Sequence, residues 1–185
     1  MNLKTFIHEA LSFTKILIIF IIIGILLRVF VFATFEVSGE SMANNFHNGD
    51  RLIVSKYAYK ISTPKRFDVV IFHENQTEDY IKRVIGLPGE KIQYVNNKLY
   101  VNDKPIVQDF LDQETYDFTL KDLLGSETVP EGYVFVLGDN RTNSKDSRVP
   151  EVGFVPIEKI IGKVSVRFGP LNKFDIGVSG NQRLK

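Results

Sequence analysis

Apolar positions divide the chain into two parts. Residues 16–35 contain 17 apolar residues in 20 positions and a single charge, Arg28. A helix of 20 residues extends about 30 Å, which matches the hydrocarbon thickness of a bilayer. The pattern therefore predicts a short N-terminal segment over 1–15, a transmembrane helix over 16–35 and a separate domain over 36–185.

Charges on either side of the apolar segment favour one orientation. Lys4 and Lys15 precede it, whereas Glu36 and Glu40 follow it. Positive charge tends to remain cytoplasmic. We therefore expect a single-pass protein of the cell membrane, with its N-terminus in the cytoplasm and its larger domain outside. Two alternatives stay open: a cleaved signal peptide, for which the segment is long, and a buried helix of a soluble protein, although a run that is apolar on every face rarely suits a small domain.

After residue 50 the pattern changes to short alternating or β-branched runs between turn signals. Seven such runs predict strands at 51–55, 67–72, 79–85, 91–95, 98–101, 132–137 and 160–168. Asn-Asn at 96–97 and Asn-Asp at 102–103 are typical of hairpin turns, because these residues tolerate positive φ. Residues 108–130 are polar and less regular, so a variable, mobile insertion is expected there. The predicted fold is mainly β, built from antiparallel sheets.

Composition excludes several kinds of site. The chain has 23 Lys and Arg against 22 Asp and Glu, so a nucleic-acid partner is not expected. It has no Cys, which excludes a thiol nucleophile and a cysteine zinc site. Its three histidines are His8, His47 and His73, without a His-Glu-x-x-His motif. We therefore expect no metal and no cofactor, and a reactive serine would need a base other than histidine.

Lysine is the alternative base. Its ordinary pKa of about 10.4 keeps it protonated at neutral pH, but burial lowers that pKa by up to about 3–5 units. Lys82 lies in the apolar run YIKRVI. Alternation places Tyr80, Lys82 and Val84 on one face of a strand and Arg83 on the other. A solvated edge-strand lysine is the competing interpretation.

Ser41 is the candidate nucleophile. It follows Phe35 by six residues, which reach about 20 Å when fully extended, so its chemistry would occur close to a membrane surface. Met42 and Phe46 are apolar neighbours that could line a groove or dip toward lipid. An ordinary loop serine is the competing interpretation.

A dense polar loop, GDNRTNSKDSR at 138–148, follows the apolar run at 132–137. It lacks the spacing of a calcium loop, because Lys145 and two arginines intrude and no bidentate Glu ends it. A loop that holds donors and carboxylates in a fixed geometry can instead orient a catalytic amine.

Together these stretches resemble bacterial type I signal peptidases, which are membrane-anchored Ser–Lys endopeptidases. GESM at 39–42 is similar to the nucleophile motif of that family, and FDVVIF at 67–72 to its core strand. YIKRVIGLPG at 80–89 is similar to the lysine motif, and residues 138–148 to the polar loop motif. The resemblance extends from the apolar segment to about Phe168.

The resemblance implies roles for the matching residues. Ser41 would be the nucleophile, Lys82 the general base, and Ser144 a hydrogen-bond partner that orients the Lys82 amine. Four charged residues would support the site: Arg83, Asp139, Asp146 and Arg148. Three residues would contact the substrate: Met42, Tyr80 and Ile81. The backbone N–H of Ser41 would bind the oxyanion, and Gly39 stands where some members carry a second, hydroxyl donor.

The resemblance also implies partners and an activity. The enzyme would remove N-terminal signal peptides from exported preproteins at the outer face of the cytoplasmic membrane, cutting after small residues. Its partners would be these preproteins, membrane lipid and the translocation machinery. The family usually continues Ser-Met with x-Pro-Thr-Leu, whereas this chain has Ala43, Asn44, Asn45 and Phe46.

Two other functions stay open on the sequence. A catalytically silent, membrane-anchored paralogue would act as a binding or scaffold module in export, and the departure at 43–45 is the reason to consider it. A self-cleaving, repressor-type Ser–Lys protease would normally carry a DNA-binding domain, for which this chain has no candidate segment.

Overall fold

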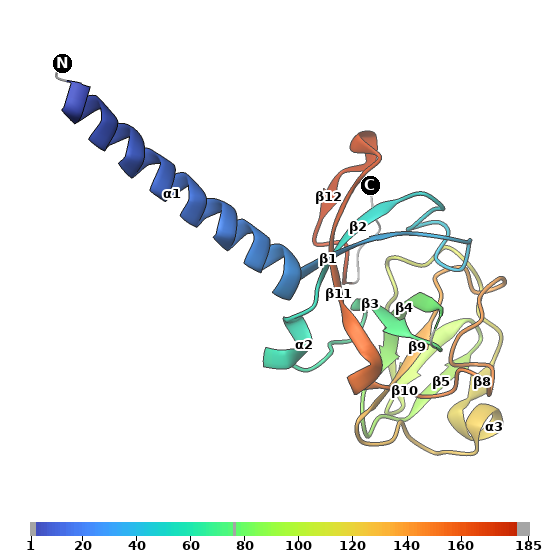
Figure 1. Ribbon diagram of the computed structural model, residues 1–185. Coiled ribbons are helices and arrows are strands. Elements are labelled where there is room, and N and C mark those ends of the chain that lie inside the picture. Colours follow the sequence, from blue (N-terminus) through green and yellow to red (C-terminus); the bar gives the residue numbers. More distant parts are fainter. Residues whose placement is uncertain (1–2, 76, 181–185) are drawn as a thin grey trace.

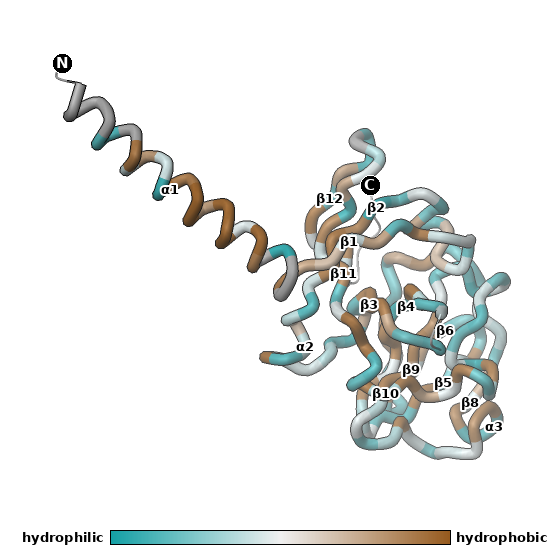
Figure 2. The backbone as a smooth tube through the Cα atoms, viewed as in Figure 1, coloured by the Kyte–Doolittle hydropathy of each residue, from teal (hydrophilic) through white to brown (hydrophobic). Residues whose placement is uncertain are grey.

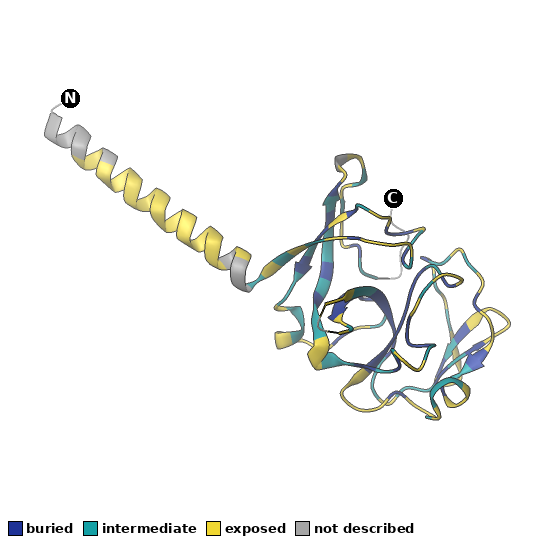
Figure 3. Cartoon of the chain, turned by 45° about the vertical axis from the view of Figure 1, so that its right-hand side comes forward, coloured by how far each residue is buried: buried dark blue, intermediate teal, exposed yellow. Residues whose placement is uncertain are grey.

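In the computed structural model, residues 3–75 and 77–180 are described; within helices, the side chains at 3–7, 10, 27, 29, 30 and 171 lie outside the description. A long helix projects from a β-rich body that contains every strand (Figure 1). Helix α1 (Leu3–Phe30) carries apolar side chains on all faces, and they are exposed (Figures 2 and 3).

The boundaries of α1 differ from the predicted transmembrane helix. The helix begins within the segment expected to precede it and ends at Phe30, after which β1 (Phe32–Glu36) begins. Residues 32–36 pair in antiparallel register with β2 (Arg51–Ser55), so the backbone groups of this stretch find their partners in a neighbouring strand. No helix within 3–75 and 77–180 combines the length and apolarity needed to cross a bilayer.

The larger sheet has eight strands, all paired antiparallel, in the order β1-β2-β11-β3-β4-β9-β10, with β12 paired to β11. Its remaining strands are β3 (Val69–His73), β4 (Asp79–Gly86), β9 (Tyr133–Leu137), β10 (Val155–Pro156), β11 (Ile160–Gly169) and β12 (Asp175–Ile176). Strands β3, β4 and β9 lie centrally and are mostly buried (Figure 3).

The smaller sheet has four strands in the order β7-β6-β5-β8. They are β5 (Ile92–Val95), β6 (Lys98–Val101), β7 (Lys104–Ile106) and β8 (Phe118–Thr119). Both predicted hairpin turns are confirmed, with positive φ at Asn96, Asn97, Asn102 and Asp103. The seven predicted strands are confirmed with small shifts of their ends. Short helices α2 (Ala58–Ile61) and α3 (Leu120–Leu124), and the 3₁₀ turns η1 (Ile157–Lys159) and η2 (Leu171–Lys173), complete the fold.

Residues 108–130, expected to form a variable, mobile insertion, contain regular secondary structure and part of the core. Strand β8 pairs with β5, and α3 follows directly, with Thr119 capping its N-terminus. Phe110, Phe118 and Val129 are buried in an aromatic core beneath the smaller sheet. The apolar residues of 108–130 contact strands far along the chain, so they show no local periodicity in the sequence.

In its pairing with β2, strand β11 contains two irregularities, between Val164 and Val166 and between Arg167 and Gly169. They change which side chains face inward, as bulges do. Arg167 becomes buried, 2% exposed, and its Nη1 donates to the carbonyl of Asn45 at 2.8 Å. A strand far along the chain thus contacts the loop that contains Ser41.

Candidate active site

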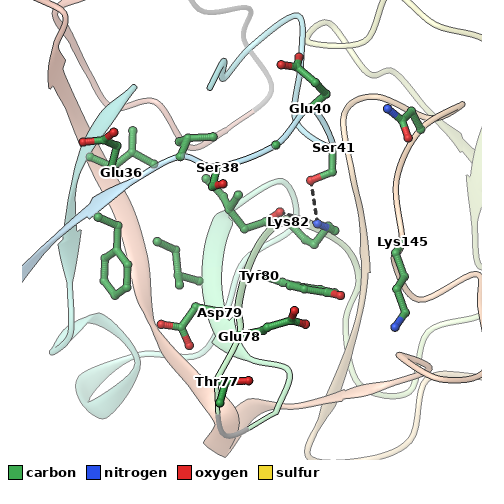
Figure 4. A pocket seen from close by; sticks show the side chains of 17 residues that line it. Glu36, Ser38, Glu40, Ser41, Thr77, Glu78, Asp79, Tyr80, Lys82 and Lys145 are labelled. Carbon is green, nitrogen blue, oxygen red and sulfur yellow. Dashed lines mark hydrogen bonds between the residues drawn. The ribbon is translucent and has the colours of Figure 1, made fainter. Parts of the chain in front are cut away.

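A cleft of about 590 Å³ opens at the junction of three segments. The cleft is lined by residues 35–41, by residues 77–82 at the start of β4, and by Asn143 and Lys145 of the polar loop. Leu52 and Ile71 complete the lining. Figure 4 shows Ser41 and Lys82 pointing toward one another, with Tyr80, Glu78 and Asp79 along one wall and Lys145 on the other. We call this the Ser41 cleft.

Ser41 and Lys82 are in direct contact. The Lys82 Nζ lies 2.9 Å from the Ser41 Oγ (dashed in Figure 4) and 3.0 Å from the carbonyl oxygen of Ile81. The same ammonium lies 4.8 Å from the centroid of the Tyr80 ring, at a distance typical of a cation–π contact. These contacts leave the amine little freedom to turn away from the hydroxyl.

Burial changes the acid–base behaviour of Lys82. Its position in β4, paired opposite Val70 of the central strand β3, leaves it 3% exposed. Removal from water lowers the pKa of Lys82 to about 8, because it disfavours the charged form, and the carboxylates of Asp146, Asp139 and Glu74 offset only part of this. A substantial fraction of this amine is therefore neutral near physiological pH.

Arg83 points to the other face of β4 and pairs with Asp139. Its Nε and Nη2 donate to the two carboxylate oxygens at 2.8 and 2.7 Å, and both side chains are at most 1% exposed. Arg83 Nη1 donates to the carbonyls of Phe67 and Gly180, at 3.1 and 2.8 Å. This bidentate pair joins the lysine strand to the start of the polar loop.

Asp146 and Arg148 form a second buried pair within the polar loop. Arg148 Nε and Nη2 donate to the carboxylate at 2.8 and 2.9 Å, and the backbone N–H of Gly138 donates to it at 2.9 Å. Burial alone would lower the pKa of Arg148, but the hydrogen bonds and charge of Asp146 outweigh it and raise that pKa. Both ion pairs thus join charged residues to which the resemblance gives supporting roles.

Ser144 does not contact Lys82 as the resemblance led us to expect. Within the described residues its Oγ is buried and has no hydrogen-bond partner. It lies against Gly138, where a Cβ would collide with the Ser144 Oγ and with the carbonyl oxygen of Ser41. The polar loop therefore approaches the serine segment closely at Gly138, where the absence of a side chain makes room.

The three expected substrate contacts are placed differently. Tyr80 and Ile81 line the Ser41 cleft, whereas Met42 does not. Met42 and Phe46 are at most 1% exposed and pack in a core cluster, and the Met42 Sδ accepts the backbone N–H of Asp139 at 3.4 Å. The expectation that these two side chains line a groove or reach lipid is wrong, because they fill the space between the loop and the sheet.

Sequence reasoning missed the polar contacts of the loop after Ser41. Asn45 is 2% exposed and its Nδ2 donates to Asp139, while Asn140 binds the Ser41 loop through its backbone N–H and its side chain. The departure from Pro-Thr at 44–45 was the signal that this loop differs. Across the described residues, no cluster of three or more His, Asp and Glu side chains is arranged to hold a metal ion.

Comparison with known proteins extends these observations. Residues 10–169 match the family described as signal peptidase, peptidase S26. The signal peptidase I of Bacillus caldolyticus is 48% identical over 157 residues, covering 80% of this chain and 85% of that protein. Signal peptidase IB of Staphylococcus aureus (strain N315) is 40% identical over 158 residues, covering 78% and 82%.

The fold also resembles that of a solved signal peptidase I structure. The crystal structure of a signal peptidase I from Enterococcus faecalis V583 superposes with a TM-score of 0.52 at 38% identity, covering 56% of this chain and 98% of that one. Sequence and fold therefore agree over the β-rich body. The chain belongs to the signal peptidase family, peptidase S26.

Proposed function

We propose that this serine endopeptidase removes N-terminal signal peptides from exported preproteins, with Ser41 as nucleophile and Lys82 as general base. The single observation that carries the assignment is the 2.9 Å contact between a buried lysine amine and a serine hydroxyl at the floor of an open cleft. Membership of the family supports the peptidase reaction. The contact between Ser41 and Lys82 supports the assignment of these two residues to it.

The contact suits proton transfer. A neutral Lys82 amine accepts the Ser41 proton as the hydroxyl oxygen attacks the scissile carbonyl carbon. The ammonium then donates that proton to the leaving amine, and an acyl-enzyme remains on Ser41. Water attacks the ester carbonyl, Lys82 takes the water's proton, and the released Ser41 oxygen is reprotonated.

The oxyanion requires donors close to Ser41. We assign the backbone N–H of Ser41 as one donor. Gly39 has no side-chain hydroxyl to add, and its backbone N–H donates to the Asn48 Oδ1 at 3.1 Å. The second donor is therefore a substrate-ordered water or a group that the substrate brings into place.

The Ser41 cleft suits an extended peptide. It runs between segment 36–41 and the strand end at 78–82, whose backbones lie on either side in Figure 4. A peptide laid between them can pair by backbone hydrogen bonds, and its side chains would meet Tyr80 and Ile81 of the cleft lining. The preference for small residues is proposed from the resemblance to type I signal peptidases.

We further propose that the region 16–35 anchors the chain to the cell membrane, with residues 36–185 extracytoplasmic. The support is the run of exposed apolar side chains from Ile16 to Ile23, together with Ile25 and Leu26, on every face of α1. Positions 27, 29 and 30 of the proposed span lie outside the described side chains. Membrane lipid and the translocation machinery are the partners that this placement brings near.

A cleavage assay tests the function. Purified full-length protein in detergent is incubated with a model preprotein, alongside Ser41→Ala and Lys82→Ala. Cleavage after a small residue by the wild type alone supports the proposal. If the wild type and both variants are equally inert while the preprotein still binds, a silent scaffold paralogue is the better account. Protease protection of 36–185 in intact cells tests the orientation separately.

A further inference from the structure

The loop after Ser41 has a backbone conformation that its sequence departure makes possible. Asn44 has φ of 83°, in the left-handed region, and Phe46 N donates to the Met42 carbonyl at 2.8 Å to close the turn. Asn adopts this region more readily than most residues, whereas proline, fixed near −65°, does not. The proline usual at position 44 is therefore incompatible with this turn.

The turn delivers Asn45 into a buried position. Its side chain is 2% exposed, and its Nδ2 donates to the carbonyl of Phe110 and to the Asp139 Oδ2, both at 2.9 Å. Both amide hydrogens are thereby used in directed bonds, one of them to an ionised carboxylate. A threonine hydroxyl has one hydrogen and cannot serve both acceptors.

Asn45 also connects the nucleophile to the lysine strand. Asp139 accepts from Asn45 on one oxygen and from Arg83 on both, and Arg83 is the neighbour of Lys82 in β4. From the other side, Arg167 of β11 holds the Asn45 carbonyl at 2.8 Å. Only three residues separate Ser41 from Asn45, so a movement of Asn45 shifts the backbone close to Ser41.

We propose that Asn45 is a positioning residue for the peptidase reaction: its amide ties the Ser41 loop to Asp139, and the left-handed Asn44 allows it to do so. The expected effect on turnover rests on the proposed function. The hydrogen bond from Asn45 to Asp139, called the tie below, does not depend on that function. In this chain the Asn44–Asn45 pair takes the place of a proline-stiffened turn. Asn45 touches neither the substrate cleft nor the reacting atoms.

Replacement of Asn45 tests the tie. In Asn45→Ala the loop loses both bonds, and a displacement of about 1 Å at Ser41 is enough to cost up to about 100-fold in turnover. We expect kcat to fall at least about tenfold with KM changed less than about twofold, since the cleft walls remain. Asn45→Thr, which keeps one donor, should lie between the wild type and Asn45→Ala. Unchanged kcat in a folded Asn45→Ala protein would overturn the inference, even if its thermal midpoint fell.

Two changes at position 44 form a matched pair. Gly accepts positive φ without strain, so Asn44→Gly should keep kcat within about twofold, because the Asn44 side chain is exposed. Asn44→Pro restores the usual family residue but forces the turn open, and it should lower kcat at least as much as Asn45→Ala. Wild-type turnover in Asn44→Pro would contradict the proposed role of the left-handed turn.

A readout without substrate separates this inference from the proposed function. The Lys82 amine can be titrated by NMR in lysine-labelled protein. Release of the loop admits water to the amine, so its pKa should rise in Asn45→Ala from about 8 toward the ordinary value and stay unchanged in Asn44→Gly. If the wild type cleaves no preprotein but this pattern holds, the proposed function fails and the tie stands. If Asn45→Ala leaves the titration unchanged, the tie fails whatever the activity.

Discussion

The lysine strand and the serine loop meet in the Ser41 cleft, and they are built in opposite ways. Lys82 belongs to β4, a regular antiparallel strand paired on both sides, by β3 and by β9. Ser41 belongs to an irregular segment held by side chains and carbonyls from distant elements, among them Asp139, Asn140 and Arg167. One partner is positioned by local backbone pairing, and the other by tertiary contacts.

The β4 strand and the Ser41 loop also differ in what stabilises them. The strand can hold a desolvated amine because its backbone bonds are satisfied whatever the side chain does. The loop has no ladder of its own and depends on buried charge pairs that tolerate little change. Substitution of Lys82 should therefore affect chemistry more than folding, whereas substitution of the buried charged residues that hold the loop, Arg83 of β4 among them, should affect folding.

The largest effect is expected at Lys82, where activity and stability should change in opposite directions. Lys82→Met removes the proposed base and should lower kcat/KM by about 10³-fold or more. It also removes a buried cation in favour of an apolar side chain of similar length, so the free energy of unfolding at pH 7 should rise by about 1–3 kcal/mol. Urea unfolding beside the cleavage assay checks both, and a joint loss of activity and stability would contradict the account of a desolvated amine.

Removal of Arg83 should mainly affect folding. Arg83→Met leaves the carboxylate of Asp139 buried without its cation, which should lower the free energy of unfolding by about 3–5 kcal/mol. Lys91→Met is the matched control, because its pair with Asp103 is solvent-exposed and should contribute less than about 1 kcal/mol. Equal effects of the two variants in denaturant titrations would mean that burial of the pair is unimportant.

Gly138→Ala probes the close approach of the polar loop to the serine segment. The added Cβ meets the Ser41 carbonyl oxygen and the Ser144 Oγ, so one of the two segments must shift. We expect a destabilisation of about 1–3 kcal/mol and a loss of kcat of about 100-fold. Gly24→Ala has open space around its Cβ and serves as the control. Normal turnover in Gly138→Ala would show that the loop can relax without moving Ser41.

The smallest step is the change in wild-type rate over a single pH unit. Because the base must be neutral, kcat/KM should rise about tenfold per pH unit below about 8 and level off above it. The folded-state pKa of Lys82 lies below its ordinary value, so the unfolded chain binds more protons between about 8 and 10.5. Over that window Lys82 makes the free energy of unfolding rise with pH. A flat rate profile from pH 5 to 9 would remove Lys82 as the base.

Sequence reasoning was most successful where structure is local. Alternation at 80–85 placed Lys82 and Arg83 on opposite faces of one strand, and the structure places them so. It failed where contacts are distant: Met42 looked like an exposed apolar residue, and 108–130 like an unpatterned insertion. Both are buried by elements far along the chain, and these partners cannot be identified from one sequence.

By itself the sequence determined the kinds of chemistry available and the elements that carry them. The absence of Cys and of a late His removed other nucleophiles and bases, and the resemblance of the lysine and serine motifs then left Ser41 and Lys82 as the best-supported catalytic pair. The near-neutral charge of the chain fits recognition of substrates without strong electrostatic attraction. Strand patterns and turn residues involve neighbouring positions, so they can be recognised in a single sequence.

Only the tertiary structure decided how the pair is held. The 2.9 Å contact, the burial that lowers the Lys82 pKa, and the tie from Asn45 to Asp139 each join segments between about 40 and 95 positions apart. Desolvation and buried hydrogen bonds depend on what surrounds a group in space. The same serine and lysine in solvent would be an ordinary hydroxyl and an ordinary ammonium.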